Sequence, residues 1–122
     1  LNLEHSELKN STLTISPKTI NLNSISNHRW AQIEWTPPED TGVWSIGIKV
    51  LTQNGNCIAT LTESEEIETC GVWIFEGLDN EGRSIYPGTY IVVLEGENIK
   101  YEEVIGRKTK VILRGLIHVT AM

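Results

Sequence analysis

The charged residues most suggestive of chemistry are Asp79, Glu81 and Arg83, which lie in and just after the segment "DNEG". Clustered carboxylates can hold a calcium ion or act as general acids and bases. This segment lacks the alternating oxygen ligands and the closing Glu of an EF-hand loop. Asp at the first position and Gly at the last are ordinary residues of a β-turn, in which the Asp side chain accepts backbone N–H bonds. We therefore predict that Asp79 braces its own turn and binds no metal.

The other residues capable of chemistry form no recognisable site. His5, His28 and His118 are far apart in the sequence and outside metal-ligand spacings, and no serine occupies a G-x-S-x-G elbow. The acidic run "ESEE", residues 63–66, is interpreted as a solvated turn rather than a cation site. A glycosidase pair could arise from any two acids that converge in space, but no sequence feature supports one. We expect a non-enzyme without cofactor or metal.

The two cysteines, Cys57 and Cys70, flank the segment "IATLTESEEIET". A hairpin centred between Glu63 and Ser64 would place them directly opposite one another, at a separation that a disulfide can bridge. Closing a loop of this length stabilises a fold by roughly 3 kcal/mol in the chain-entropy model. The alternative is two small buried thiols. We predict the disulfide, and with it an oxidising compartment such as a bacterial cell surface or periplasm.

The elements that must position these residues are strands, because the apolar period is two almost everywhere. In "GVWSIGIKVL" the alternation puts four large apolar residues on one face, and in "RWAQIEW" it predicts that Trp30 faces outward. The predicted core residues of the first segment are Trp44, Ile46, Ile48 and Val50. Further strands are predicted over residues 13–16, 57–61, 70–75, 89–94, 100–104, 109–113 and 116–120.

Turn residues separate these strands at intervals that favour a sandwich or barrel. Asn54-Gly55 predicts a type I′ hairpin, and Pro87-Gly88 suits the centre of a type II turn. The chain has 122 residues, the usual size of one domain, so we expect residues 1–122 to fold as a unit.

The charge balance excludes two classes of partner. Sixteen acids against ten bases give a formal charge of −6, which repels nucleic acid and anionic lipid. The basic residues Arg107, Lys108, Lys110 and Arg114 alternate with apolar ones, as on the solvent face of a strand. No apolar run approaches the ~20 residues that span a bilayer. We expect neither nucleic-acid binding nor membrane insertion.

The segment from Val43 to Leu94 resembles the immunoglobulin-like domain of the flagellar hook-capping protein family, which is also found as C-terminal modules of bacterial secreted proteins. The hairpin "KVLTQNGNCIATL" is similar to that family's first hairpin. The later positions of the pattern are matched by Phe75, Gly77, Asp79, Gly82, Gly88 and Tyr90. The ending G-x-x-x-x-P-G-T-Y is also similar to that of bacterial proteinase-inhibitor domains with a sandwich fold.

The resemblance implies an immunoglobulin-like or fibronectin type III-like antiparallel β-sandwich of about 7–9 strands. Gly77 and Gly82 would supply turn backbone, and Tyr90 would pack in the sandwich with its hydroxyl paired. The function implied is a non-catalytic accessory module of a larger bacterial extracytoplasmic or cell-surface protein, whose partners are other domains of that chain or other proteins. The alternative is a module that binds carbohydrate or a proteinase, with Trp30 as the platform.

Overall fold

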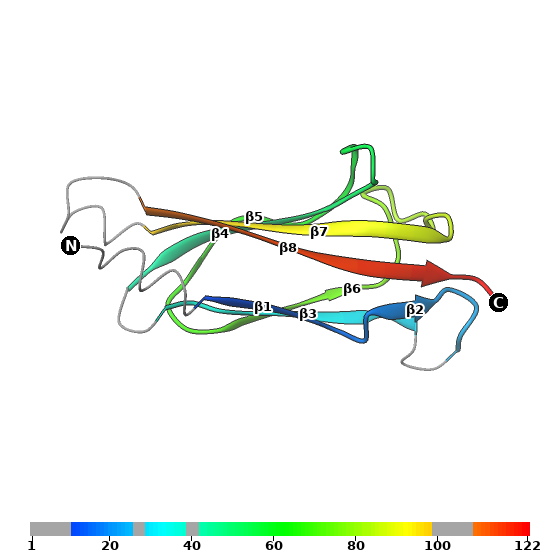
Figure 1. The fold of residues 1–122 in the computed structure, drawn as a ribbon, viewed down its shortest axis with the longest axis horizontal. Coiled ribbons are helices and arrows are strands. Elements are labelled where there is room, and N and C mark those ends of the chain that lie inside the picture. The colour runs from blue at the N-terminus through cyan, green and yellow to red at the C-terminus, as the bar shows by residue number, and fades with distance from the viewer. Residues whose placement is uncertain (1–10, 26–28, 39–41, 99–108) are drawn as a thin grey trace.

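The computed structural model of the chain describes residues 11–25, 29–38, 42–98 and 109–122. These residues are all-β, without an α-helix, and form two sheets that lie one over the other (Figure 1). The prediction of an all-β fold is confirmed. The strands are β1 (Thr12–Ser16), β2 (Thr19–Asn21), β3 (Ala31–Thr36), β4 (Trp44–Leu51), β5 (Cys57–Ile67), β6 (Gly71–Phe75), β7 (Gly88–Asn98) and β8 (Thr109–Thr120).

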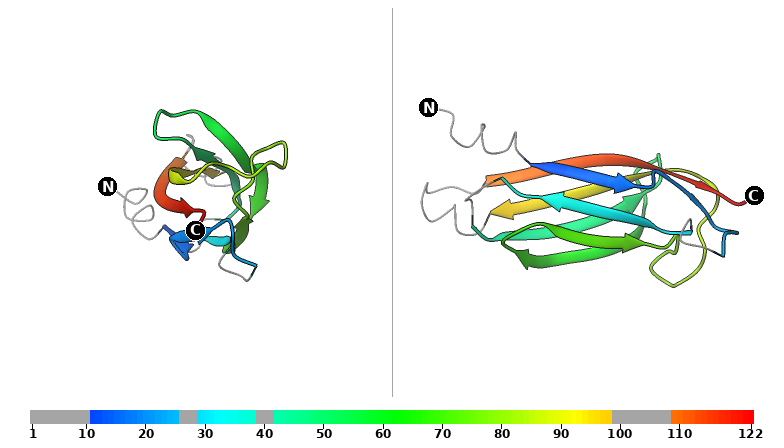
Figure 2. Two further views of the ribbon diagram at one scale, coloured as in Figure 1. Left: turned by 90° about the vertical axis from the view of Figure 1, so that its right-hand side faces the viewer. Right: turned by 90° about the horizontal axis from the view of Figure 1, so that it is seen from below.

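One sheet has three strands in the order β1-β3-β6, and the other has five in the order β2-β8-β7-β4-β5. In Figure 2 the three-stranded sheet covers part of the five-stranded one. The first two strands belong to different sheets. After β1 the chain passes through the cis peptide bond Ser16–Pro17, and β2 then pairs with the end of β8. This β2–β8 pair is parallel, whereas the other strand pairs are antiparallel.

The core lies between the sheets and follows the alternation of the sequence. The inward residues of β4 have no exposed surface, and neither does Trp35 on β3. The rings of Trp35 and Trp44 meet edge to face, with centroids 5.6 Å apart, an arrangement that aromatic pairs favour. The buried indole Nε1 of Trp35 donates a hydrogen bond of 2.8 Å to Ser11 Oγ, so its polar atom is satisfied.

The edge of β5 is partly covered by the connection between β6 and β7. The Asn80 N–H donates to the Ile58 carbonyl at 3.0 Å, and Asn80 Oδ1 accepts from the Thr60 N–H at 2.8 Å. Further along, Trp73 Nε1 on β6 donates to Glu65 Oε1 on β5 at 3.0 Å, which links the two sheets along this side. Such covering blunts a strand edge that would otherwise be open to pairing.

The hairpin between β4 and β5 exists, but its turn begins one residue earlier than predicted. The Gly55 N–H donates to the Thr52 carbonyl at 2.9 Å, so Gln53 and Asn54 occupy the centre of the turn. Gly55 follows with φ of 90°, as in a type I turn closed by a left-handed glycine. The expected type I′ turn at Asn54-Gly55 is therefore wrong.

The last strand also differs from the expectation. Residues 109–113 and 116–120 form one strand, β8, and Gly115 lies within it rather than in a turn. A Cβ at Gly115 would lie 2.6 Å from Ile15 Cδ1, so the glycine allows β1 to pack closely against β8. The predicted strand over residues 100–104 lies outside the described residues.

Candidate functional site

The carboxylate of Asp79 is fully engaged by its own turn. Its Oδ1 accepts the N–H groups of Glu81 and Arg83, both at 2.9 Å, and its Oδ2 lies 3.3 Å from Arg83 Nε. The turn is closed by a hydrogen bond of 3.0 Å from the Gly82 N–H to the Asp79 carbonyl. The Arg83 guanidinium also pairs with Glu81, at 2.8 Å. The three charged residues that suggested a site thus bind one another and the local backbone.

These contacts lower the pKa of the Asp79 carboxyl. The backbone N–H of Arg83 has the largest effect, burial opposes it, and the N–H of Glu81 and the charge of Arg83 lower the pKa further. Among the residues that the structure describes, no three His, Cys, Asp or Glu side chains gather closely enough to hold a metal ion.

Asp79→Asn should remove a pH-dependent part of the stability. A carboxyl whose pKa is lower in the folded state stabilises it fully above the ordinary Asp pKa, and this contribution is lost as the pH falls through the folded pKa. The difference in unfolding free energy between wild type and Asp79→Asn should therefore shrink as the pH is lowered. Denaturant melts across the acidic range measure it, and Glu68→Gln, which removes an exposed carboxylate elsewhere, is the matched control.

Thermal melts with and without calcium distinguish a turn brace from a metal ligand. Millimolar calcium should leave the wild-type melting temperature unchanged, because a ligand that binds only the native state raises it. A rise with calcium that disappears in Asp79→Asn would contradict the brace.

The rest of the predicted turn residues continue this scaffold. Gly77 has φ of 74°, and its carbonyl accepts the Ile85 N–H at 3.0 Å. The Tyr90 hydroxyl, at the start of β7, donates to the Tyr86 carbonyl at 2.6 Å, and burial raises the pKa of that hydroxyl.

The type II turn predicted at Pro87-Gly88 is wrong. The exposed Pro87 precedes Gly88, whose φ of 156° differs from the roughly +80° of a type II turn.

The predicted hairpin that would bring Cys57 and Cys70 together does not form. β5 runs without a break from Cys57 to Ile67, through the point where the hairpin was expected, and pairs with β4. Cys70 comes just before β6, in the other sheet. Cys57 and Cys70 are both exposed free thiols, and the predicted disulfide is absent. The alternative of two buried thiols is wrong as well.

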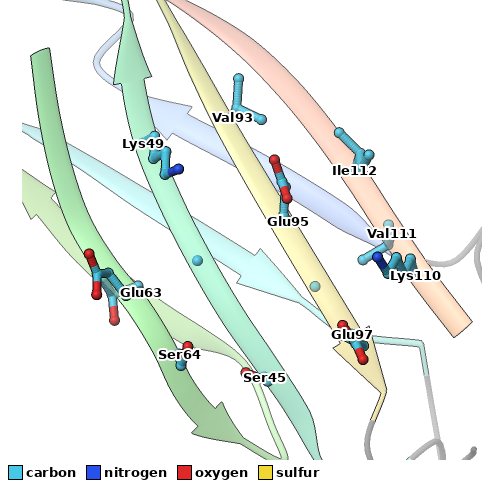
Figure 3. Close-up of a pocket in the computed structure, with 13 residues that line it drawn as sticks. Ser45, Lys49, Glu63, Ser64, Val93, Glu95, Glu97, Lys110, Val111 and Ile112 are labelled. Carbon is cyan, nitrogen blue, oxygen red and sulfur yellow. The ribbon is translucent and has the colours of Figure 1, made fainter. Parts of the chain in front are cut away.

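The structure instead shows a hollow of about 370 Å³ on the outer face of the five-stranded sheet (Figure 3). It spans β5, β4, β7 and β8. Gly47 on β4 leaves space in it, and the pairing of β4 with β5 is irregular at this point. A Cβ at Gly47 would lie 2.8 Å from the backbone oxygen of Glu63, so only glycine permits this approach.

The lining of the hollow mixes charges of both signs with aliphatic groups. Lys49 and Val93 are at one end, and Glu97 and Lys110 at the other, with Glu95 between them (Figure 3). No aromatic residue lines it, and its carboxylates belong to no metal-binding group among the described residues. The one sequence signal for the hollow was Gly47, a glycine inside a strand with strongly alternating apolar residues.

Trp30 is not part of the hollow. It lies directly before β3 in the three-stranded sheet, and 36% of its surface is exposed. On β6, the neighbour of β3, Val72 and Ile74 are also exposed, by 50% and 43%. The hollow, in contrast, belongs to the five-stranded sheet.

Comparisons with known proteins leave the family open. No family model matches the chain, and no curated protein matches it. The resemblance to the hook-capping family therefore stays a prediction. Within the described residues, no helix is both long and apolar enough to cross a membrane.

Proposed function

We propose that the chain is a non-catalytic, immunoglobulin-like accessory module that serves assembly, spacing or docking within a larger extracytoplasmic protein. The observation that carries this proposal is the strand order. The run β8-β7-β4-β5 corresponds to strands G, F, C and C′ of immunoglobulin sandwiches, and β1-β3-β6 corresponds to A, B and E.

A second feature supports the same fold type. Immunoglobulin-like sandwiches often hold a tyrosine near the start of strand F, whose hydroxyl bonds to the backbone a few residues upstream. Tyr90 occupies this place on β7 and bonds to the carbonyl of Tyr86, four residues earlier. The segment that resembles the hook-capping family, Val43 to Leu94, includes Tyr90.

The non-catalytic part of the proposal rests on how the charged groups are used. Asp79, Glu81 and Arg83 bind within one turn, and the carboxylate is held in its charged form rather than poised to exchange a proton near neutral pH. The proposed extracellular or cell-surface location rests on the resemblance alone. The two cysteines are free and so give no support for an oxidising compartment.

A ligand-binding module is the second candidate. Trp30, Val72 and Ile74 leave apolar surface exposed on the three-stranded sheet, where a sugar ring or a proteinase loop could rest on the indole.

Folding of the isolated chain tests the proposed module. An accessory domain should unfold alone in one cooperative, reversible transition, with circular dichroism and tryptophan fluorescence giving the same midpoint. A chain that does not fold by itself, or that hydrolyses chromogenic glycosides or esters, would contradict the proposal. Saturable binding of oligosaccharides or of a proteinase that is lost in Trp30→Ala would favour the second candidate instead.

A further inference from the structure

The edge of β8 that faces away from β7 is only partly occupied. At its end, the His118 N–H donates to the Lys18 carbonyl and the Leu22 N–H donates to the Thr120 carbonyl, both at 2.8 Å. β2 therefore fills this edge over residues 118–120. No other described strand pairs with β8 on this side, because β1 pairs with β3 in the other sheet.

The backbone groups along the unfilled part have a regular direction. The ladder of β8 with β7 is continuous from Thr109 to Val119, without a register shift. N–H and C=O groups alternate sides along a strand, so even-numbered residues share the direction of His118. Lys110, Ile112, Arg114 and Leu116 consequently present their N–H and C=O groups to the open edge.

The side chains of the same four residues are exposed on the outer face of the sheet. Ile112 and Leu116 have 51% and 53% of their surface exposed, and the cations Lys110 and Arg114 alternate with them. The other long edge is different, since β5 is capped by Asn80 and has acidic residues at 63, 65 and 66. Among the described residues, no loop caps residues 110–116 of this edge with backbone hydrogen bonds, and the chain has a net charge of −6.

We propose that this edge of β8 is a docking site for an extended segment of a partner protein, which adds to the sheet as a strand in line with β2. This inference rests on the proposed accessory function and names its mode of docking. The partner strand carries acidic side chains opposite Lys110 and Arg114 and apolar ones opposite Ile112 and Leu116. β2 already demonstrates that this edge accepts a strand.

Charge selects an acidic partner. On the β7 side, Arg114 is opposite the uncharged Val93, whereas Lys110 is opposite Glu97. Arg114 is therefore the main anchor for a partner carboxylate. Cross-strand pairs of opposite charge stabilise a ladder, and like charges opposite one another destabilise it.

A second copy of the chain fits this edge less well. Antiparallel pairing of two β8 strands centred on Ile112 puts Lys110 opposite Arg114, and pairing centred on Arg114 puts two arginines opposite one another. A centre at Leu113 avoids these contacts but places each cation opposite an aliphatic side chain. The −6 charge on each copy adds repulsion to every register.

The probe is a labelled, end-blocked peptide, Thr-Ile-Thr-Glu-Thr-Ile-Thr-Glu-Thr, titrated with the full chain by fluorescence anisotropy. When the peptide binds antiparallel to β8, its two Ile residues lie opposite Ile112 and Leu116. Its two Glu residues then lie opposite Lys110 and Arg114. One control peptide has Lys in place of Glu, and another has methyl groups on the two Ile nitrogens, whose N–H groups would face β8. We expect saturable binding of the first peptide, weakened at high salt, and at least tenfold weaker binding of both controls.

Variants of the chain locate the contact. Arg114→Glu should weaken binding of the Glu peptide at least threefold and strengthen binding of the Lys peptide. Lys49→Glu makes the same charge change on the outer face of β4, away from the edge, and should change the affinity less than twofold. Amide NMR shifts on binding should concentrate at residues 110–116.

Three results would overturn the docking site: no saturable binding up to millimolar peptide, equal binding of the methylated peptide, or equal effects of Arg114→Glu and Lys49→Glu. A chain that folds cooperatively yet gives any of these results retains its proposed accessory function, so the two failures are distinguishable.

Discussion

Trp44→Ala is expected to lower the free energy of unfolding by roughly 3–5 kcal/mol, the usual cost of truncating a fully buried large aromatic side chain. Trp44 has no exposed surface, and its ring meets that of Trp35 edge to face at 5.6 Å between centroids. Removal of the indole leaves a cavity between the sheets that the strands cannot close without breaking their ladders. Guanidinium melts followed by circular dichroism measure the loss.

Trp30→Ala is the matched control, because it makes the same substitution at an indole that is 36% exposed and lies directly before β3. Its cost should be clearly smaller than that of Trp44→Ala. Loss of less than 1 kcal/mol in Trp44→Ala, or equal losses in the two variants, would mean that β4 presents its other face to the core.

The core could be predicted because the strands that build it are buried on one face only. Along β4, inward residues alternate with smaller or polar outward ones, and this periodicity fixes which side chains meet the other sheet. The turn at Asp79 could also be predicted from the sequence, because its contacts join residues within four positions of one another.

The predicted hairpin at residues 63–64 failed because β5 is an edge strand. Its second half has acidic side chains in solvent, and a solvated edge has the composition of a turn. The pairing of β5 with β4 is also irregular near Gly47, which removes the simple alternation. Once the hairpin is gone, the opposition of Cys57 and Cys70 disappears with it.

The hollow and the open edge of β8 depend on the order of strands in space. Lys49, Glu95 and Ile112 come from three strands that meet only when β4, β7 and β8 pair. The basic alternation at Lys110 and Arg114 was visible in the sequence. Its position at an edge was not, because the sequence does not reveal that β1 pairs in the other sheet.

Gly77→Ala should destabilise the fold through two separable effects. Gly77 has φ of 74°, and an L-residue pays about 1–2 kcal/mol in this left-handed conformation. Its new Cβ would also lie 2.6 Å from Leu22 Cδ2 and 3.3 Å from Ile20 Cδ1, an overlap in the core that typically costs a further 1–3 kcal/mol. The sum should be measurable in denaturant melts.

Gly82→Ala separates the two effects. Gly82 has a similar φ of 81°, but nothing lies within 4 Å of the position that a Cβ would take. This variant should therefore show the backbone cost alone. The additional loss in Gly77→Ala measures the contact with Ile20 of β2 and with Leu22, which follows β2. Leu22→Ala combined with Gly77→Ala should cost less than the sum of the two single variants, because the shortened side chain gives space to the new methyl group. Equal costs for the two glycine variants would contradict the contact between Gly77 and Leu22. The loop between β6 and β7, which contains the Asp79 turn, would then not pack against the end of β2.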